Sequence, residues 1–181
     1  MQTNQDRRRQ PATLQVSRRL LPCLGLLGLL TAGAAGAQSA LPADIDALTA
    51  AQFPAVLEAN RGRVLIVNLW ATWCAPCLRE IPDLLALEQS RAEDGLTLIG
   101  ISLDDPDAED EIRKFRDEWF PAFRTFHATE TDWYGLVGQL DPNWSSILPT
   151  SFIVDRDGRV VEVLTGGRDL DAFAAAVEPY L

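Results

Sequence analysis

Short apolar runs alternate with helix-spaced apolar positions along the chain after residue 45. Residues 64–69 (VLIVNL) and 96–103 (LTLIGISL) contain β-branched residues and few polar side chains, which is typical of strands buried on both faces. Between them, residues 75–91 carry leucine and isoleucine at helical spacing. A buried strand, a helix and a second buried strand in this order predict a parallel pair joined by a helical crossover.

Caps and turns mark the elements on either side of this unit. Thr49 and Gln52 have the spacing of a helix capping box, but Pro54 moves the expected start of that helix to a later residue. Asp105-Pro106 and the acidic residues after it predict the start of another helix, because carboxylates are favourable at the positive end of a helix. The apolar positions of that helix, which we expect in the core, are Ile112, Phe115 and Trp119.

The last third of the chain predicts a hairpin and a closing helix. Asp157-Gly158 separates the apolar runs 151–155 and 159–164 and is a strong hairpin signal. Apolar residues at helical spacing follow over 170–177. The stretch 120–147 has no clear periodicity. We expect its aromatic residues to pack in the core, namely Trp133, Tyr134 and Trp144; the alternative is that they line a surface where a partner docks.

The charge balance excludes one class of partner. The 181 residues include 16 Lys and Arg against 26 Asp and Glu, a formal net charge of −10. Nucleic-acid binding depends on clustered cations, so we expect no nucleic-acid partner. With 47% hydrophobic residues the chain can form a packed core, and its length suits one domain, residues 38–181, after an N-terminal segment.

That N-terminal segment, residues 1–37, has the layout of an export signal. Its five arginines precede the apolar run Leu20–Leu30, and small residues then lead to Ala35-Gly36-Ala37, an A-x-A cleavage site. We expect cleavage near Ala37 and a periplasmic mature protein, whereas an uncleaved segment would leave the protein anchored to the membrane. Arg18-Arg19 also suits a twin-arginine export route, although Pro22 departs from the usual continuation.

The mature part would keep two cysteines, Cys74 and Cys77, at the start of the predicted helix 75–91. Pro76 suits a first helical turn, so Cys74 falls at the helix N-terminus, where free N–H groups and the helix dipole stabilise a thiolate. Cys77 lies about one turn further along, within range of a disulfide. Attack by the Cys74 thiolate on a client disulfide, followed by displacement by Cys77, would complete a redox cycle.

The same two cysteines also suit a structural disulfide or half of a zinc site. A tetrahedral zinc site needs four ligands, and only His127 and carboxylates remain to complete one. We favour the redox role and expect no metal; His127 is expected to be a surface or packing residue. No glycine-rich nucleotide motif occurs, so we expect no cofactor and a supply of electrons through thiols.

Residues 64–82, VLIVNLWATWCAPCLREIP, resemble the active-site region of thioredoxin-like proteins of the TlpA/ResA/CcmG type. The family pattern W-C-x-P-C-x-x-E-x-P is matched by residues 73–82, and a second family motif follows at Leu148-Pro149-Thr150. The resemblance implies an exported thiol:disulfide oxidoreductase. It also implies the thioredoxin fold, an α/β fold whose central mixed β-sheet is flanked by helices, with an insert before the strand that follows Pro149.

The resemblance assigns roles to individual residues. Pro149 would follow a cis peptide bond and face the cysteines, and Glu80 would relay protons beside the dithiol. Asn68 stands where thioredoxin has a buried aspartate, which leaves proton handling to Glu80; the alternative for Glu80 is an ordinary exposed helix residue. The residues expected to contact a client are Trp73, Ala75, Pro76 and Leu148.

The primary functional prediction is a periplasmic thiol:disulfide reductase with a Cys74–Cys77 dithiol/disulfide cycle. The resemblance implies a membrane thiol electron donor and protein clients, such as apocytochrome c or the copper-site cysteines of oxidase assembly, and we expect a monomer. One alternative is a general disulfide oxidant or isomerase. The other is a redox-controlled copper-binding module, against which the single histidine and single methionine count.

Overall fold

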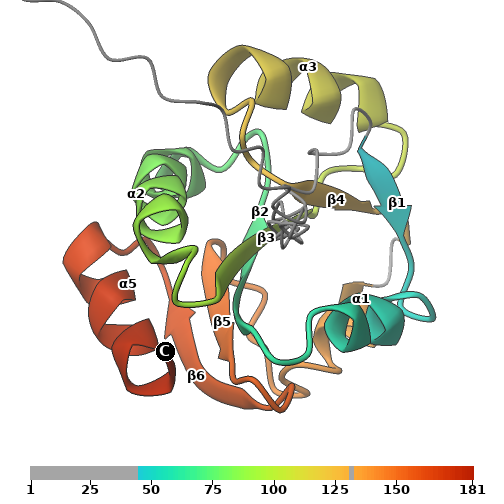
Figure 1. The fold of residues 1–181 in the computed structure, drawn as a ribbon. Helices are drawn as coiled ribbons and strands as arrows, with labels where there is room; N and C mark the ends of the chain where they lie inside the picture. Colours follow the sequence, from blue (N-terminus) through green and yellow to red (C-terminus); the bar gives the residue numbers. More distant parts are fainter. Residues whose placement is uncertain (1–44, 131–132) are drawn as a thin grey trace, which may run out of the picture. The chain divides into compact units, whose positions relative to one another are not determined.

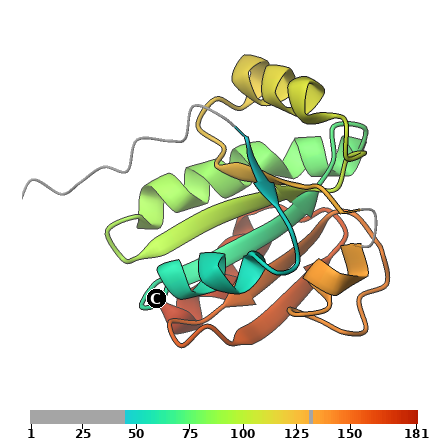
Figure 2. The same cartoon turned by 90° about the vertical axis from the view of Figure 1, so that its right-hand side faces the viewer.

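The computed structural model describes residues 45–130 and 133–181, and Figures 1 and 2 show their arrangement in two views. The predicted export signal, residues 1–37, lies outside the described residues. All described residues fall within one structural unit, Ser39–Leu181. None of the helices in this part of the chain is long and apolar enough to span a membrane.

A six-stranded mixed sheet forms the centre of this unit, in the strand order β1-β4-β3-β2-β5-β6. The strands are β1 (Asp46–Leu48), β2 (Val64–Trp70), β3 (Leu96–Ser102), β4 (Thr125–Ala128), β5 (Thr150–Val154) and β6 (Val160–Thr165). β2 lies in the middle, parallel to β3 and antiparallel to β5. β3 pairs in parallel with β4 and β4 with β1, while β6 is the antiparallel hairpin partner of β5.

Helices cover both faces of the sheet. They are α1 (Phe53–Ala59), α2 (Ala75–Arg91), α3 (Glu109–Trp119), α4 (Trp133–Val137) and α5 (Leu170–Val177), followed by a 3-10 turn at Glu178–Tyr180. α2, α3 and α5 bury apolar side chains on one face, and α1 and α4 do so on the other; Figure 1 shows α1 on the side opposite α2 and α5. Along β2, Ile66 faces the core under α2, α3 and α5, which we call the first core. Its neighbours Leu65 and Val67 face the core under α1 and α4, the second core, which is why every residue of the strand except Asn68 is apolar.

The strongest patterns in the sequence correspond to elements of the structure. α2 spans residues 75–91 as predicted, and β2 and β3 each end within one residue of the predicted strands. The closing helix spans Leu170–Val177, and Gly158 in the hairpin turn has a φ of 77°, which glycine adopts without strain. α1 begins at Phe53 with Pro54 in its first turn, which confirms the later start. The α/β fold with a mixed sheet is confirmed.

The predicted start of α3 was wrong. The helix begins at Glu109, because the residues after Asp105-Pro106 form a turn in which the Ala108 N–H donates to the Asp105 carbonyl (2.9 Å). Trp119, expected in the core, is 62% exposed. The other two predicted positions are confirmed: Ile112 is buried, and Phe115 packs against the same core. The buried Arg116, one turn after Ile112, completes this face, whereas Trp119 is the last residue of the helix.

Two short strands, β1 and β4, were not predicted. β1 has three residues and β4 four, which is too short for an alternating pattern to be recognised. β4 has the sequence TFHA, and its position in the sheet rests on parallel pairing with both β3 and β1. The stretch 120–147 is therefore part of the sheet and of the second helical layer, and not only an insert before β5.

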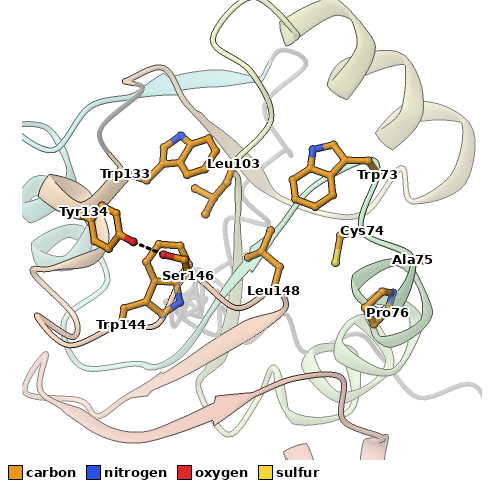
Figure 3. A pocket seen from close by; sticks show the side chains of 10 residues that line it. All are labelled: Trp73, Cys74, Ala75, Pro76, Leu103, Trp133, Tyr134, Trp144, Ser146 and Leu148. Atoms are coloured by element: carbon orange, nitrogen blue, oxygen red, sulfur yellow. Dashed lines mark hydrogen bonds between the residues drawn. The ribbon is translucent and has the colours of Figure 1, made fainter.

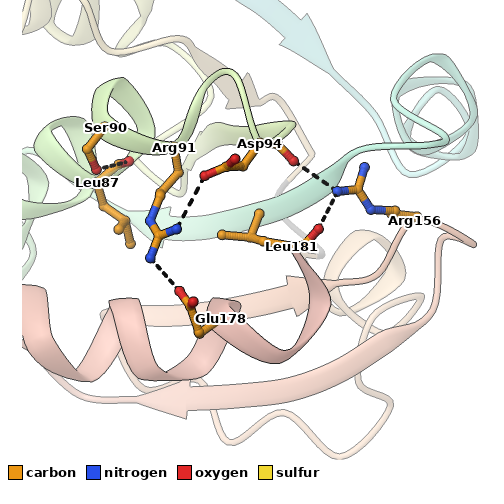
Figure 4. A network of polar contacts seen from close by, with 7 residues as sticks. All are labelled: Leu87, Ser90, Arg91, Asp94, Arg156, Glu178 and Leu181. Atoms are coloured by element: carbon orange, nitrogen blue, oxygen red, sulfur yellow. Dashed lines mark hydrogen bonds and ion pairs between the residues drawn. The ribbon is translucent and has the colours of Figure 1, made fainter.

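A polar network joins the C-terminus to the end of α2 (Figure 4). Arg91, in the last turn of α2, pairs with Asp94 (Nη1–Oδ2, 3.2 Å) and with Glu178. Nη2 of Arg156 donates to the carbonyls of Asp94 (2.9 Å) and Leu181 (2.8 Å). Ion pairs that are this exposed contribute at most about 1 kcal/mol each. The network therefore orients residues 178–181, whereas the apolar side chains of α5 supply most of the free energy that holds this helix against the sheet.

Gly100 in β3 leaves the space that a neighbouring aromatic ring fills. A Cβ atom at this position would lie 2.5 Å from Cζ of Phe123 and 2.8 Å from Oγ1 of Thr125. Phe123 in turn packs on Trp70, with 5.5 Å between ring centroids, at the end of β2. The absence of a side chain at Gly100 thus allows the packing that supports the connection between β2 and α2.

We predict that Gly100→Ala lowers the free energy of unfolding by about 1–3 kcal/mol, because the added methyl overpacks this core. Urea unfolding of the oxidised protein measures the effect. Gly135→Ala is the matched control, since a Cβ there would meet only the Cβ of Ala50, at 3.6 Å, and the change should stay within about 0.5 kcal/mol of wild type. Equal stability of the two variants would show that Phe123 moves aside without cost.

Candidate active site

Three connections meet at one edge of the sheet. β2 ends at Trp70 and leads into α2, β3 ends at Ser102, and β5 begins at Thr150 directly after Leu148-Pro149. Because β3 is parallel and β5 antiparallel to β2, the end of β3 and the start of β5 lie at the end of β2. In α/β sheets, ligand sites lie at the carboxyl ends of the parallel strands.

Cys74 and Cys77 form a disulfide across the first turn of α2, with their Cα atoms 5.3 Å apart. Cys74 is the N-cap of the helix: its Sγ accepts a hydrogen bond from the Cys77 N–H (3.3 Å), and its carbonyl accepts one from the Leu78 N–H (3.1 Å). Cys77 is fully buried, whereas Cys74 keeps 4% of its surface exposed. In the reduced protein, the helix N-terminus would stabilise negative charge on Cys74.

A buried carboxylate holds the loop that precedes Cys74. Asp104 is 3% exposed and accepts hydrogen bonds from the N–H of Thr72 (3.1 Å) and from its hydroxyl (2.6 Å). It also accepts one from the hydroxyl of Ser102, at 2.6 Å. These bonds tie the loop after β2 to the end of β3 and so fix where α2 begins. Asp104 was not predicted as a site residue, although an acidic residue directly after a buried strand was the available signal.

Glu80 is buried on α2, with only 3% of its surface exposed, so the alternative of an ordinary exposed glutamate is wrong. Its Oε1 accepts a hydrogen bond from Nδ2 of Asn68 (2.7 Å), and its Oε2 accepts one from the backbone N–H of Arg168 (3.0 Å). Nδ2 of Asn68 also donates to the hydroxyl of Ser151, at 2.9 Å.

Burial raises the pKa of Glu80 to about 7, and the hydrogen bonds from Arg168 and Asn68 oppose this rise. A carboxyl group that titrates near neutral pH therefore lies one turn after Cys77 on the same helix. His127, by contrast, is a fully buried packing residue of β4, whose Nε2 lies 3.0 Å from the carbonyl oxygen of Asp105.

A pocket of about 650 Å³ opens beside Cys74 (Figure 3). The residues expected to contact a client all line it together with Cys74: Trp73, Ala75, Pro76 and Leu148. The Leu148-Pro149 peptide bond is cis, and Pro149 itself is buried.

The other lining residues were not named as site residues, although a partner-docking surface was the alternative for the three aromatic ones. They are Leu103, Trp133, Tyr134, Trp144 and Ser146. Of the aromatic residues expected in the core, Trp144 is buried, but Tyr134 is 59% exposed. The reason is that α4 packs on the sheet through Leu136 and Val137, which leaves Tyr134 on the side that faces the pocket.

The chain matches known proteins over most of its length. A family model described as AhpC/TSA family matches residues 41–163. The thiol:disulfide interchange protein HelX of Rhodobacter capsulatus is 28% identical over 176 residues, covering 89% of this chain and 93% of that protein. The thiol-disulfide oxidoreductase ResA of Bacillus anthracis is 32% identical over 113 residues, 61% of this chain, and the chain spans only 59% of that protein's length.

A solved structure is also similar to this chain. The crystal structure of a thiol:disulfide interchange protein of the thioredoxin family from Chlorobium tepidum TLS superposes with a TM-score of 0.58 at 28% identity. The match covers 68% of this chain and 83% of that one. The thioredoxin fold expected from the sequence is confirmed.

The raised pKa of Glu80 predicts how stability depends on pH. The folded protein binds this proton more tightly than the unfolded chain, whose reference pKa is 4.5. The free energy of unfolding therefore falls as the pH rises from about 5 to about 7, because ionised Glu80 stays buried. Glu80→Gln lacks this ionisation, so its stability relative to wild type should increase over that range, by at most about 3 kcal/mol.

Urea unfolding of the two oxidised proteins across this pH range measures the difference, since disulfide-bonded cysteines do not titrate. The pKa of Glu88 is also raised by burial, but Glu88 is present in both proteins and its contribution cancels. Parallel stability curves for wild type and Glu80→Gln would contradict the raised pKa.

Proposed function

Since the chain belongs to the AhpC/TSA family, as a thioredoxin-like thiol:disulfide oxidoreductase of the TlpA/ResA/CcmG type, we propose that it reduces disulfides of client proteins in the periplasm. The observation that carries this proposal is the Cys74–Cys77 disulfide at the N-terminus of α2, with Cys74 lining an open pocket and Cys77 fully buried. A first cysteine that lines a pocket and a second one that is fully enclosed suit a nucleophile and a resolving thiol.

The proposed cycle begins with the reduced protein. The Cys74 thiolate attacks one sulfur of the client disulfide, and the other client sulfur leaves and takes up a proton. Cys77 then loses its proton and attacks the Cys74 sulfur, which releases the second client thiol and restores the Cys74–Cys77 disulfide. Two electrons pass to the client, and a membrane-bound thiol donor reduces the protein again.

Glu80 is the proposed acceptor of the Cys77 proton. Its pKa of about 7 suits a group that takes up and releases a proton near neutral pH. The hydrogen bonds from Asn68 and from the Arg168 N–H hold its carboxyl group in place when it is ionised.

Location and clients are part of the proposal. The basic head, apolar run and A-x-A site in residues 1–37 support export and cleavage near Ala37. The resemblance to the TlpA/ResA/CcmG group supports clients of cytochrome c maturation or copper-site assembly. Action as a monomer is a further part of the proposal.

We predict that Cys77→Ser traps the clients. The variant keeps the Cys74 thiolate but lacks the resolving thiol, so mixed disulfides should accumulate, whereas Cys74→Ser should form none. Both variants are expressed with the native N-terminus, and the adducts are identified by mass spectrometry of the periplasmic fraction. Small apocytochromes or copper-assembly proteins are the expected partners, and the mature N-terminus should lie near Gln38.

An unselective mixture of trapped proteins would contradict the reductant role and favour the general oxidant or isomerase. Full-length protein recovered only from the cytoplasm would refute export.

Glu80→Gln is predicted to lower at least one apparent thiol pKa of the reduced protein. Ionised Glu80 opposes a second negative charge nearby, and the variant removes that charge at nearly constant shape. The rate of thiol alkylation as a function of pH measures the effect. Glu88→Gln is the matched control, since Glu88 is on the same helix about three turns beyond Cys77. Superimposable curves for wild type and Glu80→Gln would leave the dithiol to work without this carboxyl group.

A further inference from the structure

The pocket beside Cys74 is lined mainly by apolar side chains. Its volume of about 650 Å³ falls within the range of roughly 300–1,000 Å³ found for small-molecule sites. We propose that it is a specificity pocket for one bulky apolar side chain, best an aromatic one, next to the cysteine that Cys74 attacks in the client. The inference rests on the proposed function and names its substrate class: polypeptides with such a residue beside the disulfide.

The chemistry of the walls favours an uncharged apolar occupant. None of the ten lining residues among those described is charged, and three indole rings and a phenol ring contribute to the surface. The hydroxyl groups of Tyr134 and Ser146 are hydrogen-bonded to each other, as Figure 3 shows. A charged client side chain would lose its hydration here without gaining an opposite charge, whereas an aromatic ring would gain contact with other rings.

Exposed apolar surface gathers around this pocket. Large hydrophobic side chains in the described part of the chain are exposed at only a few positions, and Trp73 (67%) and Tyr134 (59%) are among them. Ile147, 47% exposed, directly precedes the lining residue Leu148. A cluster of exposed apolar side chains on a soluble domain marks a binding surface.

The wall opposite Cys74 is already formed without a client. The rings of Tyr134 and Trp144 lie 5.9 Å apart, and Nε1 of Trp144 donates to Oγ1 of Thr150 (3.3 Å) at the start of β5. Ser146, the hydrogen-bond partner of Tyr134, has a φ of 59°, a left-handed conformation that is uncommon for a residue with a side chain. Such conformations persist where the surroundings fix them, and they concentrate at functional sites.

The position of Leu148 relates the pocket to the reaction. In Figure 3 its side chain lies between Cys74 on one side and Tyr134, Trp144 and Ser146 on the other. A client chain that runs along Leu148 with one cysteine sulfur at Cys74 places the adjacent side chain against the aromatic wall. The pocket is thus continuous with the surface at which the client sulfur must arrive, and its occupant belongs to the same polypeptide.

A pair of peptides tests the proposal. Both carry the same disulfide, and they differ only in having Phe or Ser next to one of its cysteines, with both flanking positions tried. We expect kcat/KM for reduction of the Phe peptide to exceed that of the Ser peptide by about tenfold to a hundredfold at one of these positions, from burial of the ring. The ratio of the two values is the readout, because it cancels differences in the reactivity of Cys74.

Variants of Tyr134 locate the origin of the preference. Tyr134→Ala should reduce the ratio severalfold, and Tyr134→Phe should preserve it, because the ring and not the hydroxyl forms the apolar wall. Tyr134 is exposed, so neither substitution disturbs the core. Trp119→Ala is the matched control, since Trp119 is 62% exposed but does not line this pocket, and its ratio should equal that of wild type.

Equal rates for the Phe and Ser peptides at both positions, or a preference that Tyr134→Ala leaves unchanged, would overturn the specificity pocket while leaving the reductase intact. Failure of the reduced protein to reduce either peptide would overturn the proposed function itself.

Discussion

Strand β2 pairs with β3 on one side and with β5 on the other, and this double pairing determines where each part of the site lies. The parallel partner brings Leu103 and Asp104 to the end of β2, and the antiparallel partner brings Leu148 and Pro149 to the same edge. Because β2 is buried on both faces, a one-residue slip would move every side chain into the opposite core. The position of Cys74 is therefore as well defined as the register of the sheet.

Helix α2 combines two opposing environments within its first two turns. At its N-terminus, free N–H groups and the helix dipole favour negative charge on the sulfur of Cys74. One turn after Cys77, burial disfavours negative charge on Glu80 and raises its pKa to about 7. Asn68 donates a hydrogen bond to Glu80 and carries no charge itself. An ionised aspartate at that position would add a second buried negative charge and could not donate. The first turns of the helix thus favour negative charge at Cys74 and disfavour it at Glu80.

The pocket depends on the part of the chain with the weakest sequence pattern. α4 has five residues, yet Leu136 and Val137 anchor it in the second core, and Tyr134 is left lining the pocket opposite Cys74. Short elements of this kind gain their stability from tertiary packing, because a single helical turn is not stable alone. Chemistry and recognition consequently come from different parts of the fold: the dithiol from a long, strongly patterned helix and the aromatic wall from a short, irregular segment.

The sequence by itself determined β2, α2 and the placement of the cysteines at the helix N-terminus, because each depends on neighbouring residues whose preferences agree. The cis bond before Pro149 was expected from the resemblance to the TlpA/ResA/CcmG group. The sequence also named the residues on the Cys74 side of the pocket. Only the tertiary structure decided the burial of Glu80 on α2. Its hydrogen-bond partners come from other elements: Asn68 from strand β2 and Arg168 from the loop before α5. The tertiary structure also decided the hydrogen bonds between Thr72 and Asp104 and the aromatic wall formed by Tyr134 and Trp144. Local patterns specify elements, whereas desolvation and pocket shape arise from contacts between residues far apart in the chain, and these exist only once the sheet has formed.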